Sequence, residues 1–139
     1  MKKTLLALLF ASVSSYSLAA DTQHVTVTLT SASTMSQGMA MVLANQMQEQ
    51  GAQVNILLCD TAGDLALKDA GGELLKPNDV TPAQLLGAAM KKGATASVCA
   101  LYLPNTGHKT SDLRDGIKPA SPVEMGANLL QPNRKVIGF

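Results

Sequence analysis

The segment from residue 24 to residue 59 contains the pattern that most restricts what this chain can fold into. Residues 24–30 (HVTVTLT) alternate β-branched and apolar residues over the length of a strand. Residues 54–59 (VNILLC) form a second apolar run of strand length. Between them, residues 35–50 place five apolar side chains on one face of a predicted helix: Met35, Met39, Val42, Leu43 and Met47. A strand, a helix and a strand within about 35 residues form a right-handed βαβ unit, which predicts parallel strands.

The rest of the chain continues to alternate helices and strands. Thr81-Pro82-Ala83-Gln84 is a capping box with proline at the first helical position, and it predicts a helix that runs to Lys92. The other expected elements are a short helix over residues 61–68, a strand over 95–103, a second capping box at 121–124 with a helix to about residue 130, and a strand over 135–139. This order predicts the α/β class, as a three-layer sandwich around a mainly parallel sheet of four or five strands.

The N-terminus carries the pattern of a secretory signal peptide. Lys2 and Lys3 precede the apolar run 5–13, and small residues follow it up to position 20. Because the run is too short to span a bilayer, we predict that residues 1–20 are removed and leave no membrane anchor. The mature chain, residues 21–139, is then a single domain that is periplasmic or secreted. That compartment is oxidising, which affects the interpretation of the two cysteines.

Charge and aromatic content both argue against nucleic-acid binding. The chain has 11 Lys and Arg and 10 Asp and Glu, so removing Lys2 and Lys3 leaves 9 basic against 10 acidic residues, or −1. A near-neutral domain does not attract a phosphate backbone. Tyr102 and Phe139 are the aromatic residues that remain after the leader, and two rings do not make a stacking platform for bases. We therefore expect no nucleic-acid partner.

The predicted catalytic residue is Cys99, late in the third predicted strand. Ligands in open α/β sheets bind beyond the carboxyl ends of the strands, and the loop after this strand carries His108 and Lys109. A nearby cation favours thiolate, the form that attacks sulfur, so these three residues make up the predicted catalytic set. The alternative is that Cys99 is a small core side chain, because free cysteine is among the most buried residue types.

Two further groups fall at the same edge of the predicted sheet. Ser31, Ser33 and Thr34 offer hydroxyl and backbone N–H groups for a ligand at the start of the first helix. Cys59 closes the second strand and has three interpretations: a core residue, a ligand-binding thiol, or a disulfide partner of Cys99. If the second and third strands flank the first, the two cysteines lie about 10 Å apart. A bridge requires about 7 Å or less, so this order disfavours a disulfide that the compartment would otherwise favour.

No cofactor or metal site is predicted. His24 and His108 lack the spacing of zinc ligands, and the glycines match neither a phosphate loop nor a dinucleotide fingerprint. Met35, Met39 and Met41 suggest an alternative, a Cu(I) carrier, because thioethers bind Cu(I). We interpret the methionines as core residues instead, because Met35 and Met39 lie on the face that the helix is expected to bury.

Three C-terminal motifs together give a family resemblance. They are Gly93–Leu101 (GATASVCAL), Ser111–Pro119 (SDLRDGIKP) and the predicted helix at 121–130. In this order the chain resembles the DsrE/DsrF-like family of small sulfur-relay proteins, particularly its stand-alone DsrE-like members. The resemblance covers essentially the whole mature chain. It implies an α/β sandwich that assembles as a homo-oligomer (a trimer or hexamer), and it matches Cys99 to the cysteine that receives and passes on persulfide sulfur.

The leading hypothesis is therefore a periplasmic DsrE-like protein that binds or relays sulfane (persulfide) sulfur on Cys99, and so a possible sulfurtransferase. Its partners would be a sulfur donor or acceptor protein. Two alternatives remain open. One is a non-catalytic module that binds a small anion or serves in assembly, and the other is the methionine-based Cu(I) carrier.

Overall fold

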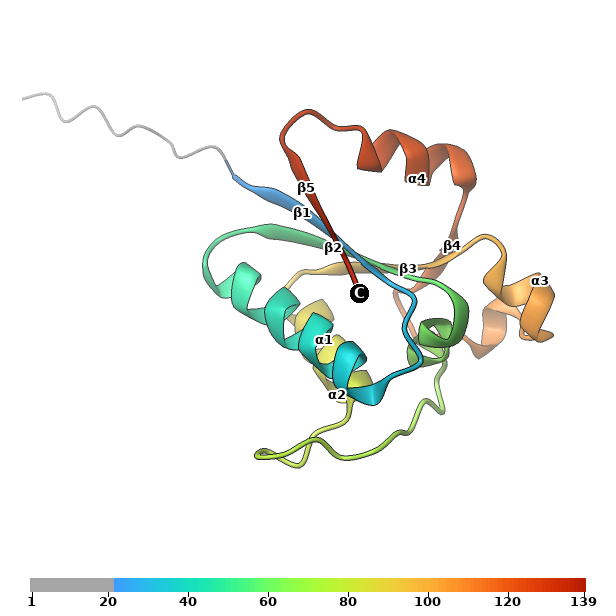
Figure 1. Cartoon of the computed structure of the whole chain (residues 1–139). Coiled ribbons are helices and arrows are strands. Elements are labelled where there is room, and N and C mark those ends of the chain that lie inside the picture. The colour runs from blue at the N-terminus through green and yellow to red at the C-terminus, as the bar shows by residue number, and fades with distance from the viewer. Residues whose placement is uncertain (1–21) are drawn as a thin grey trace, which may run out of the picture.

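The computed structural model describes residues 22–139, so the predicted signal peptide over residues 1–20 lies outside the described residues. The described chain is built around a five-stranded sheet in the order β4-β3-β2-β1-β5, with every neighbouring pair parallel (Figure 1). The strands are β1 (His24–Leu29), β2 (Gln53–Leu58), β3 (Thr95–Cys99), β4 (Lys118–Ala120) and β5 (Arg134–Gly138). The predicted α/β class with a parallel sheet is confirmed.

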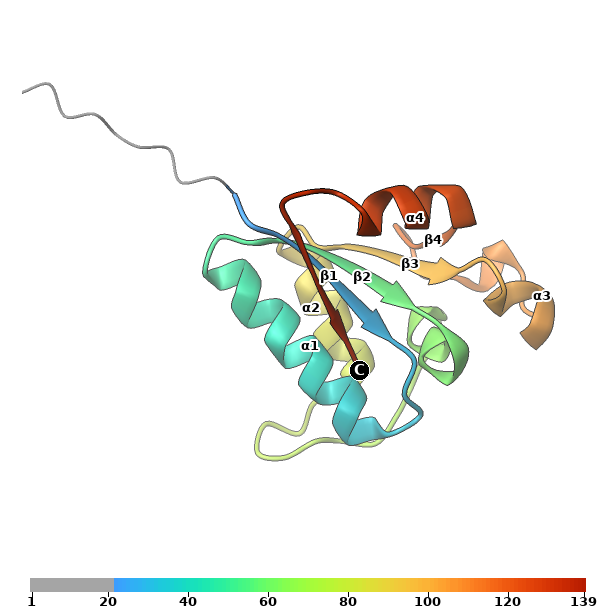
Figure 2. The same cartoon turned by 45° about the horizontal axis from the view of Figure 1, so that its top comes forward.

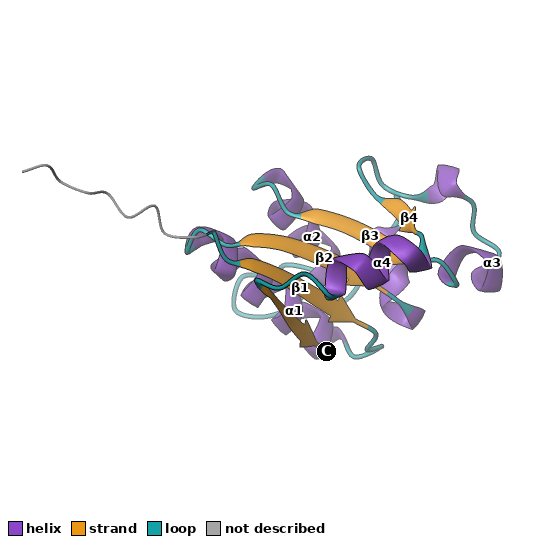
Figure 3. Ribbon diagram, turned by 90° about the horizontal axis from the view of Figure 1, so that it is seen from above, coloured by secondary structure: helices purple, strands orange, loops and turns teal. Residues whose placement is uncertain are grey.

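Helices flank the sheet on both faces (Figure 2, Figure 3). One face is covered by α1 (Thr34–Glu49), α2 (Pro82–Lys91) and a 3₁₀ segment, η1 (Asp60–Ala66). The opposite face carries α4 (Pro122–Leu129), and α3 (Tyr102–Thr106) lies beyond the end of β3 together with the short η2 (Thr110–Asp112). No helix in residues 22–139 has the length and apolarity needed to cross a membrane.

The two faces of the sheet differ in polarity because side chains alternate along each strand. The face toward α1 and α2 holds the core, which includes Val25, Val27, Leu29, Ile56, Leu58 and Val98. The face toward α4 is more polar, and Thr26, Asn55 and Ser97 lie there beside Leu57. Among them, the Thr26 hydroxyl is buried and donates a hydrogen bond to Asn128 Oδ1 of α4 at 2.9 Å. This bond ties α4 to the polar face of the sheet.

The prediction for the buried face of α1 was wrong for Met35, Met39 and Val42, whereas Met47 does pack against the core. Met35 is 73% exposed and Met39 is 52% exposed, whereas the helix buries Gln37, Gly38, Ala40, Met41, Ala44 and Asn45. Small and apolar residues occur on every side of this helix, so the spacing of its apolar residues does not predict which side is buried. Close packing decides the orientation: a Cβ added to Gly38 would overlap the Leu75 side chain. Small residues on the buried face let α1 lie near the loop before α2.

The order assumed for the second and third strands was also wrong, because they are neighbours and do not flank β1. The helix α2 packs beside α1 on the same face of the sheet. The chain that leaves β2 passes through α2 and returns as β3, which pairs with the edge of β2 that β1 does not occupy. The chain then crosses the opposite face through α4 and adds β5 to the other side of β1. Leu58 pairs with Val98 in this register, so Cys59 and Cys99 follow at matched positions.

The third strand is shorter than the predicted 95–103. It ends at Cys99, and the chain turns into α3 at Tyr102, whose buried side chain packs into the core. A short edge strand, β4, was not predicted because its Lys-Pro-Ala sequence carries no strand signal. The early end of β3 leaves Cys99 as its last residue, at the carboxyl edge of the sheet.

Candidate functional site

The carboxyl ends of β2 and β3 place two cysteines side by side on the lining of a cleft. Cys59 follows the last residue of β2, and Cys99 ends β3. Both cysteines are free and partly buried, and both border a cleft of about 1030 Å³. Each lies one residue beyond the paired Leu58 and Val98, and so on the opposite side of the sheet from those core residues. The thiols therefore face the side of the sheet that α4 covers.

Three segments far apart in the sequence form the walls of this cleft. The lining residues outside the cysteines are Asp60, Thr61, Asp64, Ala100, Leu101, Tyr102, Asn105, Thr106, Pro122, Met125, Gly126 and Leu129. Within the described part of the chain, this lining contains carboxylates and apolar groups but no Lys, Arg or His. Such a surface suits a soft or apolar group more than a small anion.

The environment of Cys59 holds it in the protonated form. Burial, followed by a hydrogen bond with the Cys99 side chain, raises the pKa of Cys59 to about 12. Its backbone is fixed by an N–H that donates to Leu29 O at 2.9 Å. The next residue, Asp60, has a φ of 52°, a left-handed conformation that turns the chain sharply into η1. Cys59 is thus a neutral S–H group beside Cys99 at neutral pH.

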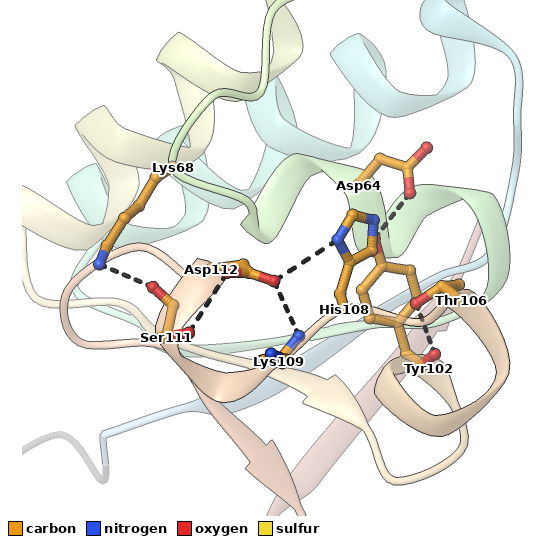
Figure 4. A network of polar contacts seen from close by, with 8 residues as sticks. All are labelled: Asp64, Lys68, Tyr102, Thr106, His108, Lys109, Ser111 and Asp112. Atoms are coloured by element: carbon orange, nitrogen blue, oxygen red, sulfur yellow. Dashed lines mark hydrogen bonds and ion pairs between the residues drawn. The ribbon is translucent and has the colours of Figure 1, made fainter.

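Tyr102, the first residue of α3, is buried and lines the cleft. The Tyr102 hydroxyl donates a hydrogen bond to Asp64 Oδ1 at 2.7 Å (Figure 4). Burial, followed by this contact with Asp64, raises the pKa of Tyr102, so the phenol remains a donor. Gly63 permits the arrangement, because a Cβ at that position would overlap the tyrosine ring. The bond links η1 to α3, and both of its residues line the cleft.

His108 and Lys109 lie outside the residues that line the cleft. The His108 ring stacks on Tyr102 with centroids 6.0 Å apart, and His108 Nδ1 is 3.8 Å from Asp112 Oδ2. The Lys109 N–H donates to the same carboxylate oxygen at 2.8 Å and is the main cause that lowers the pKa of Asp112 (Figure 4). Both residues thus contact Asp112, and their predicted role beside Cys99 stays a prediction.

The hydroxyls before α1 serve the helix end in this structure. Ser33 Oγ accepts a hydrogen bond from the Ser36 N–H at 3.4 Å, and Ser31 Oγ accepts from the Ser33 N–H at 3.1 Å. Neither these serines nor Thr34 lines the cleft that holds the cysteines. Their predicted ligand-binding role therefore stays a prediction, separate from the thiol site.

The methionines proposed for Cu(I) do not lie together. Met41 is fully buried in the core, whereas Met35 and Met39 lie on the exposed side of α1. Residues 22–139 also contain no group of three or more His, Cys, Asp or Glu side chains that could hold a metal ion.

Sequence reasoning missed most of the cleft. The sequence indicates no role for Asp64 or Tyr102, and for the α4 residues Met125 and Leu129 it predicts only a helix. The capping box at Ser121 predicts where α4 begins, but no local signal predicts that it crosses the polar face of the sheet. The pairing of Cys59 with Cys99 depended on strand order, which is a property of the whole fold.

The fold has solved relatives, although no protein-family model and no curated protein matches the chain by sequence. The YchN protein from E. coli aligns with a TM-score of 0.68 and 20% identity, over 86% of this chain and 100% of that one. The MTH1491 protein from Methanobacterium thermoautotrophicum, whose function is described as unknown, aligns with a TM-score of 0.62 and 11% identity, over 84% and 99%. At these identities the likeness establishes the fold. The chain therefore has the DsrE-like α/β fold, with a parallel sheet between helices.

Proposed function

We propose that this protein is a periplasmic sulfur carrier of the DsrE/DsrF-like family, which accepts persulfide sulfur on Cys99 and passes it to an acceptor thiol. The observation that carries the proposal is the position of Cys99: it ends β3 and borders an open cleft of about 1030 Å³. Ligand sites in open α/β sheets gather at this edge. The predicted signal peptide supports the periplasmic part of the proposal.

The proposed transfer consists of two exchanges at sulfur. Cys99 thiolate attacks the outer sulfur of a donor persulfide, R–S–SH, the donor S–S bond breaks, and R leaves as its thiol. An acceptor thiolate then attacks the outer sulfur of the Cys99 persulfide, which restores Cys99. Atoms balance in each step, and no oxidant or reductant is consumed. The protonated Cys59 beside it is a hydrogen-bond donor for sulfur held on Cys99.

The lining of the cleft supports a particular class of donor and acceptor. Asp60 and Asp64 place carboxylates at one side, and Leu101, Met125 and Leu129 supply apolar surface. An inorganic anion meets no cation among the lining residues in the described part of the chain, so its desolvation is not compensated there. We infer that the sulfur travels on an uncharged or apolar carrier, such as the cysteine of a partner protein.

An assembly role is the second candidate, and exposed apolar side chains favour it. Leu101, Val123 and Leu130 are 71%, 82% and 85% exposed, and they lie on or next to α3 and α4. Large apolar side chains in water often mark a contact surface. A homo-oligomer would cover them while leaving the chemistry at Cys99 as proposed.

Sulfur uptake tests the proposed function. The reduced mature chain is mixed with an alkyl persulfide, quenched early with an alkylating reagent and analysed by intact mass. We expect the wild type and Cys59→Ser to gain one sulfur atom and Cys99→Ser to gain none. If Cys99→Ser takes up as much sulfur as the wild type, or if no variant takes up any, the proposal is wrong.

A further inference from the structure

The site contains two thiols, and their placement is that of a pair. β2 and β3 are hydrogen-bonded neighbours, and Leu58 pairs with Val98. Neighbouring strands lie about 4.8 Å apart, and a disulfide joins Cα atoms about 4.4–6.8 Å apart. The matched residues that follow, Cys59 and Cys99, therefore fall within the range that a disulfide spans.

Direction favours the pair as well as distance. Side chains at matched positions of neighbouring strands point to the same face of a sheet. Cys59 and Cys99 both border the same cleft, and the Cys99 side chain is near enough to contribute to the raised pKa of Cys59.

We propose that Cys59 is a resolving thiol, which attacks a persulfide on Cys99, closes a Cys59–Cys99 disulfide and releases the transferred sulfur as sulfide. The inference rests on the proposed function, because it begins from the persulfide formed on Cys99. It adds a second outcome for the sulfur, alongside transfer to an acceptor thiol.

The step balances in atoms and electrons. The Cys59 sulfur bonds to Cys99 Sγ, and the bond between Cys99 Sγ and the outer sulfur breaks. The outer sulfur leaves as hydrogen sulfide, taking its own hydrogen and the proton given up by the Cys59 thiol. That sulfur is reduced and the cysteine pair is oxidised by two electrons. An external dithiol then reduces the bridge, becomes a disulfide itself and restores both cysteines.

The environment of Cys59 determines whether transfer to an acceptor thiol or attack by Cys59 comes first. Burial raises its pKa to about 12, so little of it is thiolate at neutral pH and its attack is slow. A persulfide on Cys99 therefore survives long enough for an acceptor to enter the cleft from outside. When no acceptor arrives, the neighbouring thiol removes the sulfur. The pair thus limits how long reactive sulfur is held.

The experiment follows one loaded chain over time. The reduced mature protein receives an equimolar alkyl persulfide without oxygen and without acceptor, and both intact mass and released sulfide are measured. In the wild type we expect the gain of one sulfur to decay into a product two hydrogens lighter than the reduced chain, with one sulfide released per chain. In Cys59→Ser and Cys59→Ala, we expect the added sulfur to persist at least tenfold longer, with no bridge formed. Circular dichroism of both variants confirms that they are folded.

The outcomes separate this inference from the proposed function. If the wild type keeps the added sulfur as long as Cys59→Ser does, Cys59 is not a resolving thiol, and sulfur uptake on Cys99 still stands. A bridge that forms without release of sulfide also overturns the inference, because the persulfide was then not its source. If neither Cys59 variant gains sulfur at all, the proposed function itself fails.

Discussion

At the residue scale, the protonated state of Cys59 links the site to stability. Its folded pKa of about 12 lies above the ordinary value of 9.0, so the folded chain holds this proton more tightly than the unfolded chain does. The resulting contribution to the free energy of unfolding is complete below pH 9.0 and is lost as the pH rises toward 12.

The corresponding prediction concerns alkaline denaturation. We expect the free energy of unfolding of the wild type, relative to Cys59→Ala, to be constant up to the ordinary thiol pKa of 9.0 and to fall as the pH rises from there toward 12. The alanine variant lacks the titrating thiol, so urea unfolding of both proteins across this range isolates the effect. A difference between them that does not change with pH would contradict the protonated state assigned to Cys59.

Arg114 is a second residue whose role depends on contacts that the sequence does not reveal. Its guanidinium donates to Leu67 O and Ala83 O at 2.9 Å and to Ala70 O at 3.3 Å, and burial lowers its pKa. These bonds hold the loop between η1 and α2. We expect Arg114→Met to reduce the free energy of unfolding by about 2–3 kcal/mol, because partly buried carbonyls lose their donor.

Urea unfolding measures this loss, and Arg114→Lys is the matched control. Lysine keeps the charge but cannot reach three carbonyls from one planar group, so we expect it to recover a part of the stability. An Arg114→Met variant as stable as the wild type would show that the three hydrogen bonds do not hold the loop.

At the element scale, α4 is the least supported wall of the cleft. It has no buried residue, and its start depends on a capping box in which the Glu124 N–H donates to Ser121 Oγ at 3.2 Å. We expect Ser121→Ala to destabilise the helix by about 1 kcal/mol and to speed amide hydrogen exchange in α4. Exchange in α1 and α2 is the internal control. Equal protection of α4 in both proteins would contradict the role of the cap.

The elements also show how far the sequence predicted the fold and the site. The capping boxes at Thr81 and Ser121 predicted the starts of α2 and α4, because the hydrogen bonds that form them are local. Local pattern failed for α1, where Gly38 and Ala40 are buried while Met35 and Met39 are exposed. It also failed for strand order, which depends on how α2 packs beside α1. The partnership of Cys59 and Cys99 followed from that order, so the sequence did not predict it.

At the scale of the whole molecule, the remaining apolar surface bears on assembly. Met35 and Met39 on α1 and Val123 and Leu130 at α4 are exposed in the single chain. The family resemblance implies a trimer or hexamer, and we expect light scattering to give a multiple of the mass of one chain. Val123→Lys is expected to weaken this assembly, because it buries a charge at the contact. A monomer at all concentrations would contradict the oligomer.

Peptide mapping shows where the transferred sulfur is bound and so tests the proposed role of Cys99. A chain loaded with an isotopically labelled persulfide is quenched early, digested and mapped before and after an acceptor thiol is added. We expect the label on the peptide that contains Cys99 before the acceptor is added, and on the acceptor afterwards. Label found on Cys59 alone, or label on Cys99 that no acceptor thiol removes, would contradict the account.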